Sequence, residues 1–166
     1  MKTRASSYSK IRGFTVVEMI IVVIVIGLLA TVTLVVYRGT QERSRYSVMQ
    51  QDLSGINKAL QLYFGDNSKY PSFGGGSTGC VTANSSQTLT LDGIVPIYMA
   101  KIPIIPNDGL AGYYAYCVNA SQLEYKLVRL VPGGVTLPSP EQSDTRPDAA
   151  RAGRGWGFWS TGGSAL

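Results

Sequence analysis

One apolar run constrains this chain more than any other feature. Residues 14–37 read FTVVEMIIVVIVIGLLATVTLVVY and contain one charged residue, Glu18. At about 1.5 Å per residue, a helix of this length would be roughly 36 Å long, which exceeds a hydrocarbon core of about 30 Å. Because four basic residues and no acid lie in the first 12 positions, we expect a membrane-spanning helix with a cytoplasmic N-terminus and an exported body.

The composition excludes several classes of function. The 166 residues include no histidine, which removes Ser-His-Asp and Cys-His catalysis and His-ligated zinc. Four of the 15 Lys/Arg residues lie in the first 12 positions, and the other 11 face 10 Asp/Glu residues. This nearly neutral body lacks the clustered basic surface that nucleic-acid binding needs. We therefore expect no enzymatic activity, no cofactor, no metal and no specific nucleic-acid partner.

Two simpler interpretations of the apolar run are a cleaved secretory signal peptide and a plain single-span anchor. The run is longer than the usual apolar region of a signal peptide, and residues 28–31 near its end lack an A-x-A arrangement. Neither interpretation explains Glu18. An uncompensated carboxylate deep in lipid is unfavourable, so by default it indicates a functional site.

Residues 10–19 read KIRGFTVVEM and resemble the leader and cleavage segment of type IV pilin-like prepilins. This family includes type IV pilins and the pseudopilins of type II secretion and DNA-uptake systems, and the resemblance covers about residues 10–37. It implies that a prepilin peptidase cuts between Gly13 and Phe14 and methylates the new amine of Phe14. It also implies that the mature chain leaves the cytoplasmic membrane at a pilus assembly platform. The chain would then enter a periplasmic or cell-surface filament with copies of itself and related pilins.

Elementary electrostatics gives Glu18 a role in such a filament. Cleavage after Gly13 would create a cation at Phe14, and an acid four residues further on offers the compensating charge. The two charges can meet within one helix or between neighbouring subunits. Our hypothesis is that Glu18 fixes subunit addition by pairing with the Phe14 amine of a neighbour, much as a buried polar residue sets register in a coiled coil.

Beyond the apolar run, a stripe of apolar residues continues at helical spacing. Its members are Tyr46, Met49, Leu53, Ile56, Leu60 and Tyr63. We expect one helix from near Phe14 to Phe64, with residues 65–67 as its stop signal and the stripe packed on the protein's own sheet. The expected organisation is a leader over 1–13, a long helix over 14–65, a β-rich head over 66–138 and a tail over 139–166. The predicted fold class is α+β, with a small antiparallel sheet.

Within the head, residues 113–118 and 123–131 are predicted strands joined by a hairpin turn at 119–122. Polar and apolar residues alternate over 88–91, which predicts a shorter strand. The segment 94–105 is apolar but contains two prolines, so we expect it to be irregular or a short helix. Polar residues of the second long strand predict one solvent-facing side; they are Glu124, Lys126 and Arg129.

Cys80 and Cys117 are predicted to form a disulfide, because an exported head lies in an oxidising compartment. The bridge would join a loop to a strand across 36 intervening residues. Asn107 and Asp108 supply two oxygen donors, fewer than the six to eight that calcium takes, so a plain turn is favoured over the calcium loop that some pseudopilins carry. The glycines at 74–76 precede no Lys-Ser/Thr, which argues against a phosphate-binding loop.

The tail contains three aromatic residues within positions 156–159. They are either an exposed adhesion patch or a last strand that attaches the tail to the head. We favour the strand, because exposed tryptophans promote aggregation. The leading functional prediction is a structural subunit of a type IV pilus or pseudopilus. The alternative is a single-pass membrane-anchored adhesin or binding protein that acts without polymerising.

Overall fold

The computed structural model describes residues 13–105, 112–133, 146–148 and 154–166, with only the backbone over 32–42. Residues 1–12 of the leader, the turn at Asn107 and Asp108, and the first part of the tail lie outside these residues. The chain divides into two compact units, Met1–Arg43 and Ser44–Leu166.

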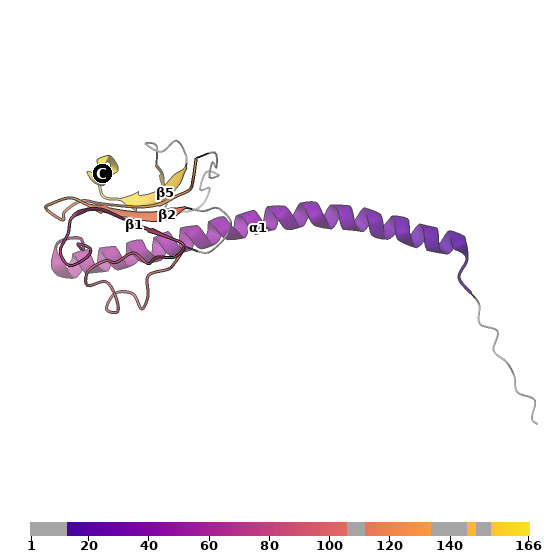
Figure 1. Cartoon of the computed structure of the whole chain (residues 1–166), viewed down its shortest axis with the longest axis horizontal. Helices are drawn as coiled ribbons and strands as arrows, with labels where there is room; N and C mark the ends of the chain where they lie inside the picture. Colours follow the sequence, from indigo (N-terminus) through magenta and orange to yellow (C-terminus); the bar gives the residue numbers. More distant parts are fainter. Residues whose placement is uncertain (1–12, 106–111, 134–145, 149–153) are drawn as a thin grey trace, which may run out of the picture. The chain divides into compact units, whose positions relative to one another are not determined.

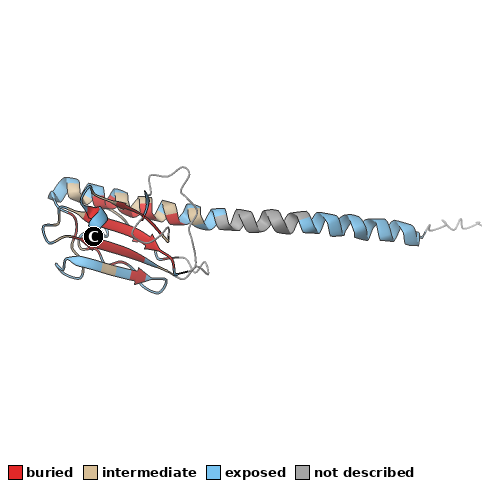
Figure 2. Cartoon of the chain, turned by 90° about the horizontal axis from the view of Figure 1, so that it is seen from above, coloured by how far each residue is buried: buried red, intermediate tan, exposed pale blue. Residues whose placement is uncertain are grey.

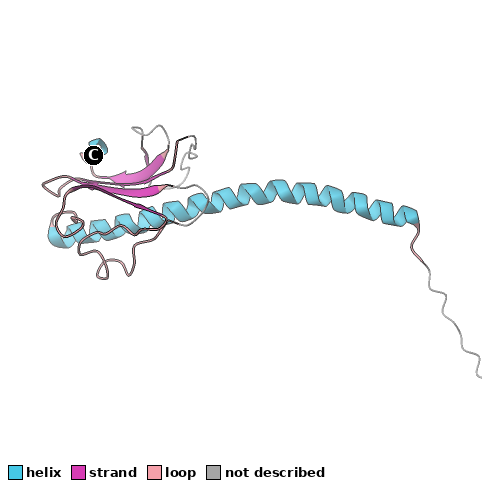
Figure 3. Cartoon of the chain, viewed as in Figure 1, coloured by secondary structure: helices cyan, strands magenta, loops and turns pink. Residues whose placement is uncertain are grey.

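One long helix, α1, spans Val16–Asn67 (Figure 3). It continues three residues past the predicted end at Phe64, because Gly65 remains helical. The helix ends at Ser68, whose φ of 55° is left-handed and whose amide donates to the Phe64 carbonyl at 2.8 Å. Among the residues that are described, no helix is both long and apolar enough to cross a membrane.

The second unit contains a five-stranded antiparallel sheet. The strands are β1 (Gly79–Asn84), β2 (Tyr113–Val118), β3 (Tyr125–Leu130), β4 (Arg146–Pro147) and β5 (Gly155–Trp159). They lie in the order β1-β2-β3-β5-β4, and a short 3-10 helix, η2 (Gly163–Ala165), follows β5. Figure 1 shows the sheet lying along the C-terminal part of α1. The α+β fold class is therefore confirmed.

The predicted apolar stripe of the helix packs against the sheet. Its buried members are Met49, Leu53, Ile56 and Leu60, while Tyr46 and Tyr63 are partly buried at its two ends. In Figure 2 the buried residues gather where α1 faces the sheet. Tyr114 adds a polar link, because its hydroxyl donates to the Asp52 carboxylate at 3.0 Å. Burial raises the pKa of Asp52, although this hydrogen bond opposes the increase.

The strand predictions are partly confirmed. The predicted strand 113–118 coincides with β2, and β3 lies within 123–131. At the turn between them, the Asn119 side chain accepts hydrogen bonds from the Leu123 and Glu124 amides. The predicted strand at 88–91 is wrong: only Leu91 forms an isolated bridge, with Phe73. The segment 94–105 has no regular strand or helix, as expected.

The prediction of a solvent-facing side on β3 is wrong. Lys126 is 2% exposed and Arg129 is 1% exposed. They lie on opposite faces, because side chains alternate along a strand. Arg129 lies 5.6 Å from the ring of Tyr114, and the C-terminal residues cover Lys126. The covering segment includes β5, which pairs with β3, so the prediction that the aromatic tail forms a last strand is confirmed.

Candidate functional site

The predicted cleavage point lies just before α1. Gly13 and Phe14 are exposed and outside the helix, and the Phe14 side chain is 77% exposed. An added Cβ at Gly13 would meet nothing within 4 Å. Non-helical, exposed backbone is the form in which a protease can reach a peptide bond.

The helix begins with a reciprocal contact between Thr15 and Glu18. The Glu18 amide donates to the Thr15 hydroxyl at 3.2 Å. In return, the Thr15 amide and hydroxyl donate to the Glu18 carboxylate at 2.9 and 2.8 Å. This is a capping box, in which a threonine and a glutamate three residues later satisfy the free amides at a helix start.

Sequence reasoning overlooked Thr15, although the Thr-x-x-Glu spacing was available as a signal. All of the Glu18 side-chain hydrogen bonds that the structure describes go to Thr15. The Phe14 amine is not a partner in this chain, because its nitrogen is still the amide that follows Gly13. The pairing of Glu18 with that amine therefore stays a prediction.

The first turns of α1 present a continuous apolar surface. Its large hydrophobic side chains are between 47% and 76% exposed. A shallow apolar groove lies on this surface, lined by Val16, Met19, Ile20, Val23 and Ile24. A soluble monomer rarely exposes so large an apolar surface, and such a surface ordinarily marks a site of interaction with protein or membrane.

The predicted disulfide between Cys80 and Cys117 is confirmed, with an S–S distance of 2.05 Å. Cys80 lies on β1, which the sequence analysis treated as a loop, and it stands directly opposite Cys117 of β2. The bridge thus attaches the edge strand β1 to its neighbour β2. Cys80 is exposed, whereas Cys117 is buried.

Comparison with known proteins places this N-terminal segment in a family. Residues 8–34 match the model described as the prokaryotic N-terminal methylation motif, which includes Gly13, Phe14 and Glu18. The chain is 27% identical over 133 residues to the type II secretion system core protein G of Klebsiella pneumoniae, a match that covers 80% of this chain and 90% of that protein. Both comparisons therefore support the resemblance to type IV pilin-like prepilins.

Two further relatives carry the same description. The core protein G of Pectobacterium carotovorum subsp. carotovorum is 28% identical over 57% of this chain and 61% of its own length. That of Escherichia coli strain K12 is 29% identical over 58% of this chain and 67% of its own length. No solved structure matches the chain. None of these descriptions names an enzymatic activity.

Proposed function

We propose that the chain is a structural subunit of the pseudopilus of a type II secretion system. The observation that carries the proposal is the extent of the similarity to the Klebsiella pneumoniae core protein G, which covers 133 residues. A match confined to the methylation motif at residues 8–34 would be compatible with any prepilin. Similarity that continues through the head favours the pseudopilin branch of the family.

The subunit is processed before it assembles. A prepilin peptidase cuts the exposed bond between Gly13 and Phe14 and methylates the amine that this releases. The exposure of both residues and the start of α1 at Val16 support this step, because the bond lies outside the helix.

The apolar surface of the first unit determines where the subunit resides. Residues 14–37 span the cytoplasmic membrane before assembly, and the head lies in the periplasm. Extraction at the assembly platform then transfers this surface from lipid to the helices of neighbouring subunits, which are copies of this chain and related pseudopilins. The exposed side chains on the first turns of α1 support this transfer, since both environments are apolar.

Glu18 determines the register between adjacent subunits of the filament. Before assembly its carboxylate is held by Thr15, so the acid is not left without hydrogen bonds in lipid. After cleavage the Phe14 nitrogen becomes a cation. In a staggered stack this cation pairs with Glu18 of the adjacent subunit, and the new charge pair competes with the contact to Thr15.

The test uses the full chain, produced with a prepilin peptidase and the secretion machinery. Intact mass should correspond to a chain that starts at Phe14 and carries one added methyl group. Glu18→Ala should be processed normally but should abolish filaments in electron micrographs, whereas Asp66→Asn, a change in the head, should leave them intact. Filaments of normal yield from Glu18→Ala would contradict the pairing. A monomeric chain that retains residues 1–13 would instead indicate a membrane-anchored binding protein.

A further inference from the structure

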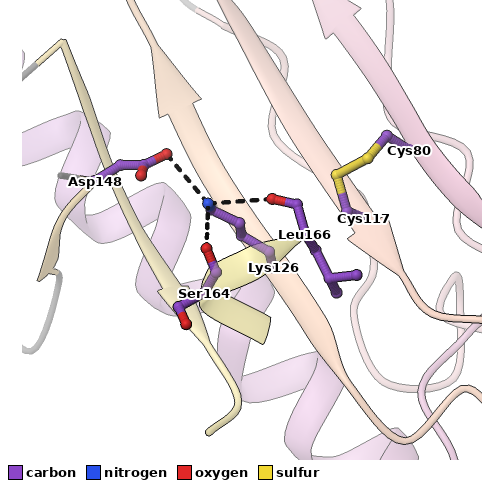
Figure 4. Close-up of polar contacts among 6 residues, drawn as sticks. All are labelled: Cys80, Cys117, Lys126, Asp148, Ser164 and Leu166. Carbon is purple, nitrogen blue, oxygen red and sulfur yellow. Dashed lines mark hydrogen bonds and ion pairs between the residues drawn. A yellow bond between two sulfur atoms is a disulfide. The ribbon is translucent and has the colours of Figure 1, made fainter. Parts of the chain in front are cut away.

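Lys126 is a charged residue in the middle of the sheet that is almost completely buried. Its side chain is 2% exposed. It extends from β3 on the face that lies away from α1, and its ammonium group is surrounded by oxygen atoms (Figure 4). The main-chain oxygens of Ser164 and Leu166 accept hydrogen bonds at 3.1 and 3.2 Å, and a carboxylate oxygen of Asp148 lies at 3.5 Å.

These three oxygens match the donor capacity of the ammonium group. A lysine ammonium has three N–H donors and no acceptor, so one carboxylate and two main-chain oxygens can satisfy it. The ring of Trp159 adds a weaker attraction, with its centroid 5.8 Å from the ammonium nitrogen. A carboxylate together with main-chain carbonyls is also the kind of oxygen set that binds hard cations such as calcium.

All three acceptor oxygens come from one part of the chain. Asp148 precedes β5, whereas Ser164 and Leu166 follow it. Lys126 therefore contacts both flanks of β5 from its position on β3. We refer to residues 146–148 and 154–166 together as the C-terminal segment.

The C-terminal segment lies very close to β3, which leaves little space for any other ligand. An added Cβ at Gly163 would fall on the Tyr125 carbonyl, and one at Gly162 would lie 2.8 Å from the Glu124 carboxyl carbon. The Gly162 amide also donates to the Glu124 carboxylate at 2.9 Å. These contacts hold the residues that directly precede Ser164 against β3.

We propose that Asp148, Ser164 and Leu166 form a cation site whose resident cation is the Lys126 ammonium group. This internal cation holds the C-terminal segment on the sheet and makes its attachment independent of a bound metal. If a metal ion held the segment instead, the attachment would depend on that metal. If apolar packing and the β3–β5 pairing alone held it, the charge of Lys126 would be dispensable.

The first test compares hydrogen exchange in full-length variants purified in detergent. Lys126→Met keeps an unbranched side chain that is one atom shorter and removes the charge, and Lys58→Met is the matched control, because Lys58 is exposed on α1. The expected result is exchange on the order of a hundredfold faster in residues 160–166 of Lys126→Met, because a buried carboxylate has lost its opposite charge. Unchanged protection of these residues would overturn the proposal.

A second test remains informative if Lys126→Met fails to fold. Lys126→Ala leaves space for a small amine, so n-propylammonium should restore most of the lost protection in residues 160–166. The neutral analogue n-propanol should not. Equal rescue by both compounds, or by neither, would overturn the role of the charge. In the unchanged chain, calcium and EDTA should leave exchange of these residues unaltered, and loss of protection with EDTA would assign the site to a metal.

Discussion

Thr15 and Glu18 hydrogen-bond to each other in both directions at the first turn of α1. The contact gives a double role to a residue pair that lies directly after the proposed cleavage point. It stabilises the start of the helix, and it provides partners for a carboxylate that would otherwise be isolated among apolar side chains.

Replacement of Thr15 by valine should loosen the start of α1. Valine has a similar shape but no hydroxyl, so the Glu18 amide loses its acceptor. We expect this amide to exchange about fivefold faster, the effect of losing one helix cap. Hydrogen exchange of the full chain in detergent measures the change. Thr15→Ser keeps the hydroxyl and should behave like the original chain; equal exchange in the serine and valine variants would show that the cap is not responsible.

Removal of the disulfide should weaken the head. Cys80 and Cys117 are 37 positions apart, and a bridge over a loop of this length contributes about 3–4 kcal/mol in the chain-entropy model. The double variant with serine at both positions should lose about this amount in denaturant unfolding. Dithiothreitol should lower the stability of the original chain to a similar value and leave the double variant unchanged. If dithiothreitol also destabilised the double variant, its effect on the original chain could not be assigned to this disulfide.

Gly157 should tolerate no side chain. An added Cβ would fall on the Leu127 carbonyl and lie 2.6 Å from a methyl group of Val128. We expect Gly157→Ala to destabilise the head by about 1–3 kcal/mol, as overpacking usually does. The control is Gly65→Ala, where an added Cβ meets nothing within 4 Å and should increase helix stability by up to about 1 kcal/mol. Thermal unfolding monitored by tryptophan fluorescence compares them, and equal stability of the two variants would refute the close approach.

The stability of the loop that contains the three glycines at 74–76 should depend on pH, because Asp92 holds this loop. Its carboxylate accepts hydrogen bonds from the Gly75 and Gly76 amides and the Ser72 hydroxyl. Desolvation raises the pKa of Asp92, but these hydrogen bonds outweigh it, so the pKa lies below its ordinary value of 3.8.

A lowered pKa fixes the sign of the effect. When the loop opens, Asp92 loses these hydrogen bonds and binds a proton more readily. The hydrogen-bonded loop is therefore fully stabilised above pH 3.8, and it becomes less stable as the pH falls through the lowered pKa of Asp92. NMR titration should show the Gly75 and Gly76 amides losing protection only in this acid range. Asp92→Asn should increase their exchange at neutral pH, whereas Asp66→Asn should not. A midpoint for Asp92 above 3.8 would contradict the prediction.

The helix and the two central strands could be predicted because their signals are local. The apolar stripe of α1 repeats at helical spacing, and β2 and β3 are rich in residues that favour strands. β1 gave no such signal. Its sequence GCVTAN begins with glycine and ends with asparagine, and it pairs on only one side, so its conformation depends on β2 and the disulfide.

The burial of Lys126 and Arg129 could not be predicted for a different reason. Charged residues ordinarily face solvent, and only the return of the C-terminal segment covers Lys126. That contact joins residues 38 and 40 positions apart, which a pattern within one strand cannot report. At the candidate site, the motif at residues 10–19 identified Gly13, Phe14 and Glu18, but the capping box with Thr15 became evident only from side-chain geometry.

The strand order β1-β2-β3-β5-β4 also determines when the β-sheet of the head can be completed. β5 is the last described strand along the chain, yet it lies between β3 and β4. Without residues 155–159, β3 would keep an unpaired edge and Lys126 would lack the main-chain oxygens that follow β5. Closure of the sheet thus requires the end of the chain, and a chain truncated before Gly155 would leave the edge of β3 open to pairing with other chains.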